Sequence, residues 1–320
     1  MMAEVLCIGE LLIDFICEDI GMGLVEGNRF IKKAGGAPAN VAAAIARLGG
    51  SSAFMGKVGN DHFGNYLQQY LNSFGIDTSG LVIDMSHPTT LAFVSLQHDG
   101  ERDFIFNRGA DQHLSRFEVD EVLYQRIPII HFGAATAFLE EPLRDTYKNL
   151  LEKARGQGKF ISFDPNFRID LWKGREREYI NAIMDQLHDV DFVKLSEEEA
   201  KLLYQTGDLN ECCVKMHEKG IKIAAITLGK KGTLLSMKDR AQIIESIPIQ
   251  SIDSTGAGDA FVGGFLYKVS LLLNSKDVLQ HPEKVMEYVR FANRVGALTC
   301  TRMGAMDALP TMKEVEEEIK

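Results

Sequence analysis

The chain has 320 residues, 45% of them hydrophobic, and carries a formal net charge of −10 at pH 7. This length suffices for one large α/β domain or for a domain with an added module, and the apolar fraction supports a sizeable core. The acidic balance and the lack of a basic stripe argue against nucleic acid and anionic membranes as partners, so an anionic ligand must be held by local groups.

The cysteines and the first residues indicate a cytoplasmic protein. The five cysteines are scattered, and none stands in a C-x-x-C pair, so reduced thiols fit better than a disulfide framework or a zinc site. Glu4 stands where a signal peptide carries basic residues, and no apolar run is long enough to cross a bilayer. We therefore expect a protein of the cytoplasm without a membrane partner.

Short apolar runs recur along the chain and predict buried parallel strands. They lie at residues 5–9, 128–133, 160–164, 191–195 and 223–229. Between them, residues 41–49 and 142–158 show helical spacing, and the second of these stretches ends in basic residues and glycine, as helices do. The alternation predicts an α/β fold with a mostly parallel sheet and helices on both of its faces.

Two early segments break this alternation. Residues 89–108 show two runs of period-two patterning around Asp99-Gly100, which is a strong hairpin turn signal. Residues 11–33 read as strand, loop and strand. Together these segments predict a small separate sheet, which must bury one face over a ligand cleft or against another subunit. We expect one domain over residues 1–320 with a lid formed by about 12–33 and 88–108.

Polar side chains follow several of the predicted strands. Ligands of open parallel sheets bind beyond the carboxyl ends of the strands, so these side chains are expected to converge on one site. They are Asp14 after the first run, Asp164, Asn166 and Arg168 after the third, Lys194, Ser196 and Glu199 at the fourth, and Thr227 and Gly229 at the fifth.

The stretch DSTGAGDAF, residues 253–261, has the composition of an anion-binding turn. Gly256, Ala257 and Gly258 expose backbone N–H groups almost without side-chain obstruction, and a helix that starts near Gly258 places them at its positive end. Asp259 then lies in the first helical turn, where the dipole is expected to favour its ionised form and ready it to accept a proton. The alternative is a tight turn in which Asp259 only stabilises the start of the helix.

A second glycine cluster, Gly35-Gly36-Ala37-Pro38-Ala39-Asn40, precedes the first predicted helix. Its glycines permit close approach of the backbone to a polar ligand, and Asn40 offers a donor and an acceptor to hydroxyl groups. No Walker A motif, no G-x-G-x-x-G fingerprint and no protein-kinase motif set is present, and GKKG at 229–232 fits none of them. A phosphoryl-transfer enzyme with this sequence must bind phosphate through another element. A nicotinamide dehydrogenase is a remote possibility, because the sequence lacks the glycine fingerprint of that class.

The two glycine clusters resemble the two signatures of the ribokinase-like (PfkB) carbohydrate kinases, and within that family the sequence is most similar to the fructokinases. The resemblance runs in order along essentially the whole chain. It rests on GELLIDF, KKAGGAPANVAAAIARLGG, GKVGNDHFG, LAFVSLQHDGERDF, FDPNFRIDLW, KLSEEEA, DSTGAGDAFVGGF and FANRVGALTCTRMGAMDALPT. DPNFR followed by LW favours the fructokinases.

The resemblance implies a Rossmann-like three-layer α/β/α core with a β-sheet lid, and transfer of the γ-phosphate of ATP to the 6-hydroxyl of fructose. It implies Asp259 as the catalytic base and an anion hole at Gly256, Ala257 and Gly258. It also implies sugar contacts at Asp14, Gly35, Gly36 and Asn40, lid-side contacts at Phe104 and Phe106, and site arginines at Arg108 and Arg168.

On the nucleotide side, Lys194, Thr227, Gly229, Gly232 and Asn293 match family positions near ATP. Glu199 would help to organise Mg²⁺, although Ser196 stands where many relatives carry Asn. Positions that form a monovalent-cation site in ribokinases, and so point to K⁺, are matched by Asp253, Thr255, Thr299, Arg302, Gly304 and Ala308, chiefly through backbone carbonyls.

Several alternatives remain open at this point. The substrate could instead be 2-keto-3-deoxygluconate, ribose or a nucleoside, and a non-catalytic sugar or nucleotide sensor on the same fold is a remote alternative. A homodimer through the lid sheets is expected because an isolated small sheet has a second face to cover.

Overall fold

The computed structural model describes residues 3–19, 21–96, 102–238 and 240–317. Its core is a nine-stranded sheet in the order β13-β12-β11-β10-β9-β8-β1-β4-β5, parallel from β11 to β5 and antiparallel at the β12–β13 edge. The strands are β1 (Val5–Ile8), β4 (Ser52–Gly59), β5 (Asp77–Asp84), β8 (Ile129–Gly133), β9 (Phe160–Asp164), β10 (Phe192–Ser196), β11 (Ile223–Thr227), β12 (Thr233–Met237) and β13 (Arg240–Ile244). The predicted, mostly parallel sheet is confirmed.

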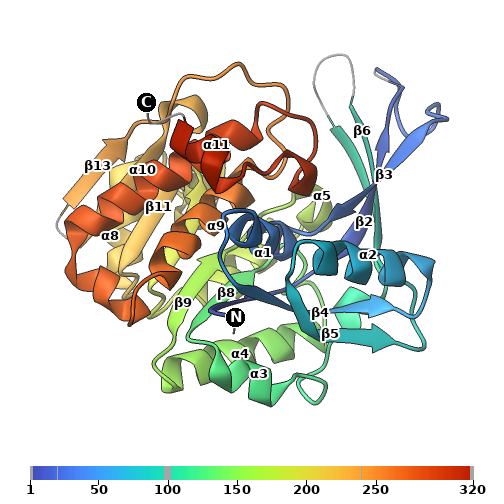
Figure 1. The fold of residues 1–320 in the computed structure, drawn as a ribbon, viewed down its shortest axis with the longest axis horizontal. Coiled ribbons are helices and arrows are strands. Elements are labelled where there is room, and N and C mark those ends of the chain that lie inside the picture. The colour runs from blue at the N-terminus through green and yellow to red at the C-terminus, as the bar shows by residue number, and fades with distance from the viewer. Residues whose placement is uncertain (1–2, 20, 97–101, 239, 318–320) are drawn as a thin grey trace.

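Helices cover both faces of this sheet, as Figure 1 shows. Alternate side chains of each strand point to opposite faces, so the sheet and its helices form two separate hydrophobic cores. On one face lie α1 (Ala37–Arg47), α2 (His62–Ser73), α9 (Ala257–Ser270), α10 (Pro282–Thr299) and α11 (Met312–Glu317). On the other lie α3 (Glu121–Arg126), α4 (Leu143–Gly156), α5 (Ile169–Trp172), α6 (Glu176–Met184), α7 (Glu197–Tyr204) and α8 (Leu209–Glu218). The predicted three-layer α/β/α arrangement is therefore confirmed.

Helix α9 packs closely on α1, and this contact determines the geometry of the site described below. A Cβ atom added to Gly263 of α9 would lie 2.4 Å from the Cβ atom of Ala44 in α1, so glycine is needed for the two backbones to approach this closely. Helix α1 presents small, buried side chains to this contact, which its alanine-rich sequence supplies. The close packing brings the first turn of α1 beside the first turn of α9.

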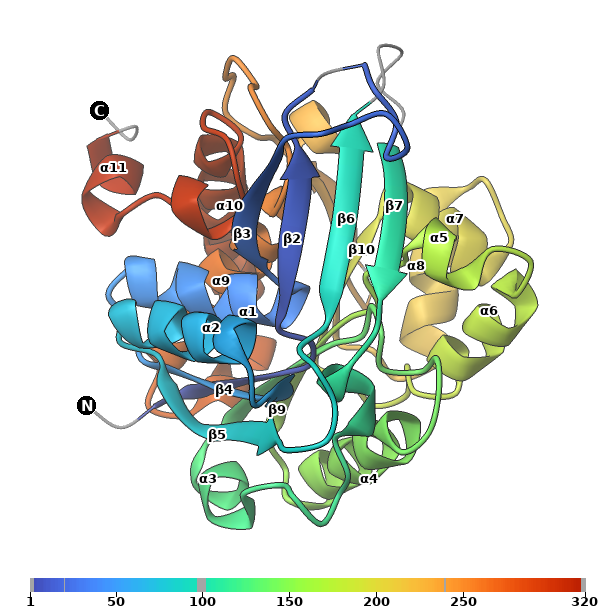
Figure 2. The same ribbon diagram turned by 90° about the vertical axis from the view of Figure 1, so that its right-hand side faces the viewer.

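Four strands outside the core form a small sheet in the order β3-β2-β6-β7, which faces the viewer in Figure 2. They are β2 (Leu12–Cys17), β3 (Phe30–Gly35), β6 (Leu91–Leu96) and β7 (Arg102–Asn107). Strands β2 and β6 pair in parallel, and the two outer pairs are antiparallel. The predicted turn at Asp99-Gly100 lies outside the described residues.

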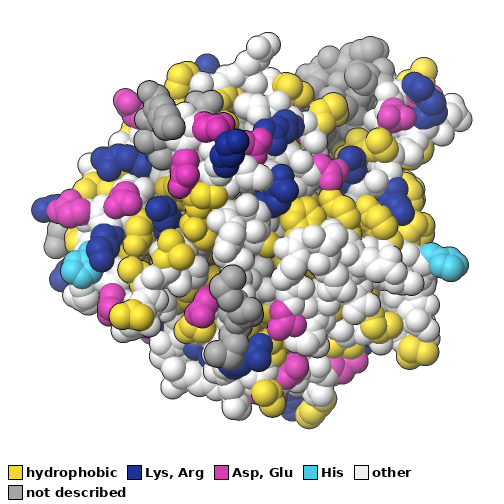
Figure 3. Space-filling model, in the orientation of Figure 1, with side chains coloured by type: hydrophobic (Ala, Val, Ile, Leu, Met, Phe, Trp, Pro, Cys, Tyr) yellow, Lys and Arg dark blue, Asp and Glu magenta, His cyan; other side chains and the backbone are white. Residues whose placement is uncertain are grey.

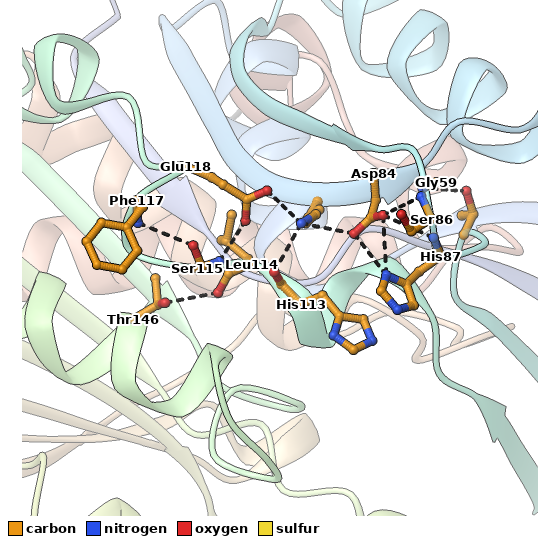
Figure 4. A network of polar contacts seen from close by, with 12 residues as sticks. Gly59, Asp84, Ser86, His87, His113, Leu114, Ser115, Phe117, Glu118 and Thr146 are labelled. Carbon is orange, nitrogen blue, oxygen red and sulfur yellow. Dashed lines mark hydrogen bonds and ion pairs between the residues drawn. The ribbon is translucent and has the colours of Figure 1, made fainter.

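A buried polar network fixes the point at which the chain leaves β5 for β6 (Figure 4). The Lys57 ammonium of β4 pairs with Asp84 at 2.9 Å and with Glu118 at 2.7 Å. Asp84, the last residue of β5, also accepts hydrogen bonds from the backbone amides of Ser86 and His87 at 2.8 and 3.0 Å. A buried network whose members bond one another holds a single geometry, so it anchors the base of the small sheet.

The surface carries charges of both signs. Figure 3 shows Lys and Arg side chains interspersed with Asp and Glu over one face, so this face presents no extended field of one sign. Within the described parts of the chain, no helix combines the length and the apolar character that crossing a bilayer requires.

Candidate active site

Two adjoining cavities lie at the carboxyl ends of the core strands. The first, of about 420 Å³, is also lined by residues of the small sheet, and the second, of about 680 Å³, lies beside β11, β12 and α10. Ser254 and Gly258 line both cavities. The turn that precedes α9 therefore forms the boundary between them.

This turn has the open backbone that an anion hole needs. Helix α9 begins at Ala257, one residue before the predicted start, and its N-cap residue Gly256 has φ 75° and makes no side-chain cap. A Cβ atom at Gly256 would lie 2.8 Å from the Cβ of Ala305, so the position has neither the conformation nor the space for another residue. The first amides of α9 remain without a capping side chain at the positive end of the helix dipole.

Asp259 lies in the first turn of α9 and is buried. Its Oδ2 accepts a hydrogen bond of 2.7 Å from Nδ2 of Asn40 in the first turn of α1. Burial raises the pKa of Asp259, while this hydrogen bond and the positive charges of Lys194 and Arg168 oppose the rise. The net shift is upward because loss of hydration outweighs the groups that favour the ionised form. A raised pKa brings a carboxylate closer to the range of an effective general base.

Lys194 supplies a buried positive charge next to the same turn. Its Nζ lies 3.1 Å from Oδ2 of Asp164, and a Cβ atom built on Gly258 would lie 3.0 Å from that Nζ. Burial works against the charged form, but the carboxylates of Asp164, Glu199 and Asp259 together raise the pKa of Lys194. The sequence placed Lys194 on the nucleotide side, whereas in the structure it lines the first cavity.

Most of the predicted sugar contacts line the first cavity. They are Asp14, Gly36, Asn40, Phe104, Phe106, Arg168 and Asp259. Gly35 is not among the lining residues. It leaves room for the Asp14 carboxylate, because a Cβ atom at Gly35 would lie 2.0 Å from that group. Phe104 and Phe106 stack on each other with ring centroids 5.6 Å apart and form an apolar wall on the small sheet.

Arg108 lies apart from this set. Its guanidinium pairs with Asp111 at 2.7 Å, and Asp111 also accepts the hydroxyl of Thr90. The hydroxyl of Thr90 in turn accepts the Gly109 amide at 2.8 Å. Arg108 is not among the residues that line either cavity, so the structure places it in the junction between β7 and the core.

The predicted nucleotide-side residues Thr227, Gly229, Gly232 and Asn293 all line the second cavity. Asn293 accepts the hydroxyl of Thr233 at 2.7 Å and donates to the carbonyl of Ile244 at 2.8 Å, so it holds the wall of the cavity together. Gly232 has φ 98°, and a Cβ atom there would lie 2.1 Å from the Ile244 carbonyl oxygen. The shape of this wall therefore depends on residues of three different segments.

Glu199 is buried and binds two backbone amides. One carboxylate oxygen accepts the Ser196 amide at 2.6 Å, which completes a capping box at the start of α7, and the other accepts the Phe167 amide at 2.6 Å. Glu199 therefore ties the loop that carries Arg168 to the end of β10. Ser196 serves as the N-cap of α7.

Replacement of Glu199 by alanine is expected to lower the free energy of unfolding by about 2 kcal/mol, because a cap and a charge-assisted hydrogen bond to Phe167 are lost together. Glu198→Ala, an exposed position in the same helical turn, is the matched control and is expected to change little. Urea denaturation of both variants measures the difference. Equal stabilities of the two variants contradict the structural assignment of Glu199.

The segments of the predicted monovalent-cation site lie side by side. Asp253 accepts the amide and hydroxyl of Thr255 at 2.9 and 2.6 Å and the amide of Gly304 at 2.9 Å. The Thr299 hydroxyl donates to the Val295 carbonyl, the Arg302 side chain pairs with Glu314, and Ala308 is buried in the short helix Met306–Ala308. Within the described chain, no group of three or more His, Cys, Asp or Glu residues is arranged to hold a metal ion.

Several residues of the first cavity were not predicted as site residues. Glu10, Thr136 and Asp170 line it, and Ser254 lines both cavities. Glu10 lies two residues after β1 and so shares the signal that identified Asp14, a polar residue after the first apolar run. Thr136 follows β8 within a run of alanines and carries no sequence signal of its own.

Comparison with known proteins identifies the class to which this fold and site belong. The family model for the pfkB family carbohydrate kinases matches residues 2–312. The chain therefore belongs to this family, and it is a sugar kinase.

Individual relatives agree with this assignment. Fructokinase-1 of Oryza sativa subsp. japonica is 40% identical over 316 residues, which cover 97% of this chain and 96% of the relative. The structure of a fructokinase from Xylella fastidiosa with bound ATP superimposes with a TM-score of 0.90 at 32% identity and covers 100% of both chains. A fructokinase double mutant from Vibrio cholerae with fructose, ADP and potassium has a TM-score of 0.87 at 33% identity, with 100% of this chain and 99% of that one covered.

Proposed function

We propose that this protein is an ATP-dependent fructokinase that transfers the terminal phosphoryl group of ATP to the 6-hydroxyl of D-fructose. The observation that carries the proposal is the position of Asp259 and of the start of α9, which no side chain caps, at the boundary of two adjoining cavities. A sugar in the first cavity and a nucleotide in the second would meet at this boundary. Such placement supplies the proximity that phosphoryl transfer chiefly requires.

The residues at the boundary divide the chemistry between them. The sugar hydroxyl gives its proton to Asp259 while its oxygen attacks the terminal phosphorus, and the bond from that phosphorus to the leaving ADP oxygen breaks. The amides at the start of α9 and the Lys194 ammonium offset the negative charge on the phosphoryl oxygens in transfer. Asn40 holds Asp259 through its 2.7 Å hydrogen bond.

We propose fructose as the acceptor because several relatives that cover nearly the whole chain are fructokinases. This holds for the rice and maize proteins at 40% identity and for the Xylella and Vibrio structures at 32% and 33%. The Vibrio structure contains fructose and ADP together. Arg168 and the aromatic wall of Phe104 and Phe106 line the cavity in which such a sugar would lie.

A panel of acceptors tests this function. ADP formation is measured with ATP and Mg²⁺ and with D-fructose, ribose, a nucleoside or 2-keto-3-deoxygluconate, each with and without potassium. The highest kcat/KM is expected for fructose. A higher value for another acceptor replaces fructose as the substrate, and binding of ATP and sugar without turnover supports the sensor instead.

The ions belong to the same proposal. Mg²⁺ would accompany ATP, and Glu199 would contact it through water, because each of its carboxylate oxygens keeps a lone pair beyond the amide that it accepts. K⁺ would be held by backbone carbonyls of residues 253–255 and 299–308. A rate of fructose phosphorylation that is equal with and without potassium contradicts activation by this ion.

We further propose that the small sheet closes over the sugar as a lid and that two lids meet in a homodimer. Phe104 and Phe106 of the small sheet line the first cavity, and on the opposite face of β7 Ile105 is 55% exposed. Closure would exclude water from the reaction. Absence of compaction in solution scattering with sugar and an ATP analogue contradicts closure, and a monomer mass by light scattering contradicts the dimer. A cytoplasmic location is supported by the five free cysteines.

A further inference from the structure

Four buried polar atoms on residues that line the first cavity have no hydrogen-bond partner among the described residues. They are Oε2 of Glu10, Oδ1 of Asn40, Oγ1 of Thr136 and Nδ2 of Asn166. Buried polar atoms in proteins are nearly always hydrogen-bonded, and each one left without a partner costs about 1–3 kcal/mol. A cluster of such atoms around one cavity therefore indicates a ligand with several hydroxyl groups.

Glu10 is held so that only one of its carboxyl oxygens is available. The residue lies in the short link between β1 and β2 and is 3% exposed. Its Oε1 accepts the Ala37 amide at the start of α1 at 2.9 Å. Its carbonyl oxygen lies 2.3 Å from where a Cβ atom at Gly36 would be, so glycine lets the second chain segment pack against it. The carboxyl group is thus held by the Ala37 amide and the Glu10 backbone by its packing on Gly36, and Oε2 is left for a ligand.

The protonation state of the Glu10 carboxyl group suits hydrogen bonding to a sugar hydroxyl. Burial raises the pKa of Glu10 to about 8, against the opposing effect of the amide hydrogen bonds. A protonated carboxyl group both donates and accepts hydrogen bonds, and so does a hydroxyl group, so the two match in either orientation.

The hydroxyl of Thr136 differs in its hydrogen bonding from that of a buried threonine with a purely structural role. The hydroxyl of Thr146, which is also buried, donates to the carbonyls of Leu114 and Pro142 at 2.9 and 3.0 Å. The hydroxyl of Thr136, with 1% of the residue exposed, has no such partner within the described chain. Thr136 follows β8, the direct neighbour of β1, so it shares a side of the cavity with Glu10.

We infer that Glu10 and Thr136 are specificity-determining residues, which bind hydroxyl groups of the sugar other than the one that faces Asp259. This inference rests on the proposed kinase function and names two contacts within it. A site built to bond a substrate hydroxyl rejects the analogue that lacks it, because its own buried polar atom is then left unpaired. Glu10 and Thr136 would thus select for the hydroxyl pattern of the acceptor.

The test uses Thr136→Val and Glu10→Met, which remove the polar atoms at nearly constant volume. Each variant is expected to raise KM for fructose about tenfold and to leave KM for ATP within about twofold, since one buried hydrogen bond to substrate is lost. Glu10→Gln keeps an oxygen for Ala37 and one polar atom for the sugar, and should restore most of the affinity. Thr146→Val is the matched control: it is expected to lower stability, because the bonds to Leu114 and Pro142 are lost, and to keep the wild-type KM for both substrates.

Monodeoxy analogues of fructose separate contact from structure. On the analogue that lacks the contacted hydroxyl, variant and wild type are expected to have equal kcat/KM, because the bond is already absent. An equal loss on every analogue, or KM for fructose within twofold of wild type in both variants, overturns the inference. If the wild type itself does not phosphorylate fructose, the proposed function fails, and the assignment of these two residues to fructose fails with it.

Discussion

Replacement of Asp259 by asparagine is expected to lower kcat for the phosphorylation of fructose by about 10²- to 10⁴-fold, the usual contribution of a general base. The substitution keeps the shape of the side chain and an oxygen that can accept from Nδ2 of Asn40, so sugar and nucleotide should still bind. KM for both substrates is therefore expected to change little. Steady-state kinetics with a coupled assay for ADP measures the effect.

A matched control distinguishes loss of the base from general damage. Asp185→Asn changes an exposed aspartate at the end of α6, and it is expected to keep the activity of the wild type. Thermal unfolding of both variants checks that Asp259→Asn is folded. A folded Asp259→Asn protein with kcat within tenfold of wild type refutes the assignment of the base.

The sequence was sufficient for the features whose causes are local. The buried parallel strands show continuous apolar runs because both faces of the sheet are covered, and β8, β9, β10 and β11 were found in this way. Since the carboxyl ends of parallel strands meet at one edge, the polar residues that follow them could be expected to converge. Arg168 and Lys194 do line one cavity with Asp259.

Features that depend on contacts between residues far apart in the sequence were not predicted. Strand β4 contains Gly56 and Lys57, which interrupt its apolar pattern, yet the strand is buried throughout. A Cβ atom at Gly56 would lie 2.4 Å from the carbonyl oxygen of Gly9 in the segment after β1, so the reason for the glycine lies in another segment. Lys57 is tolerated only because Asp84 and Glu118 pair with it. No local pattern reports such pairs.

The pKa shift of Asp259 and the ion pair of Arg108 could not be predicted from the sequence, for the same kind of reason. A helix dipole can be inferred from a sequence, but the burial that outweighs it requires the whole fold. Arg108 matches a site arginine by position, yet its guanidinium forms an ion pair with Asp111, three residues later in the chain. The alignment of a motif therefore gives the residue but not its partner.

Replacement of Lys194 by methionine is the second substitution with a large expected effect. It removes the ammonium next to the open turn and is expected to lower kcat by about 10²- to 10³-fold, as loss of one preorganised charge-stabilising group does. It also leaves Asp164 buried without its partner, which should lower the free energy of unfolding by about 1–3 kcal/mol. Steady-state kinetics and urea denaturation measure the two effects.

The pH profile separates an electrostatic role of Lys194 from a structural one. Its positive charge lowers the pKa values of Asp259 and Asp164, although burial raises that of Asp164 to about 7. Without Lys194 both pKa values rise, so Asp259 is protonated at a higher pH and the acid limb of kcat moves to higher pH.

Lys159→Met is the matched control for this pH profile. It removes a buried ammonium that donates to the carbonyls of Gln125 and Ile127, outside both cavities, and should lower stability while the acid limb stays in place. An acid limb that is unmoved in Lys194→Met, or displaced to lower pH, contradicts the coupling of Lys194 to the base.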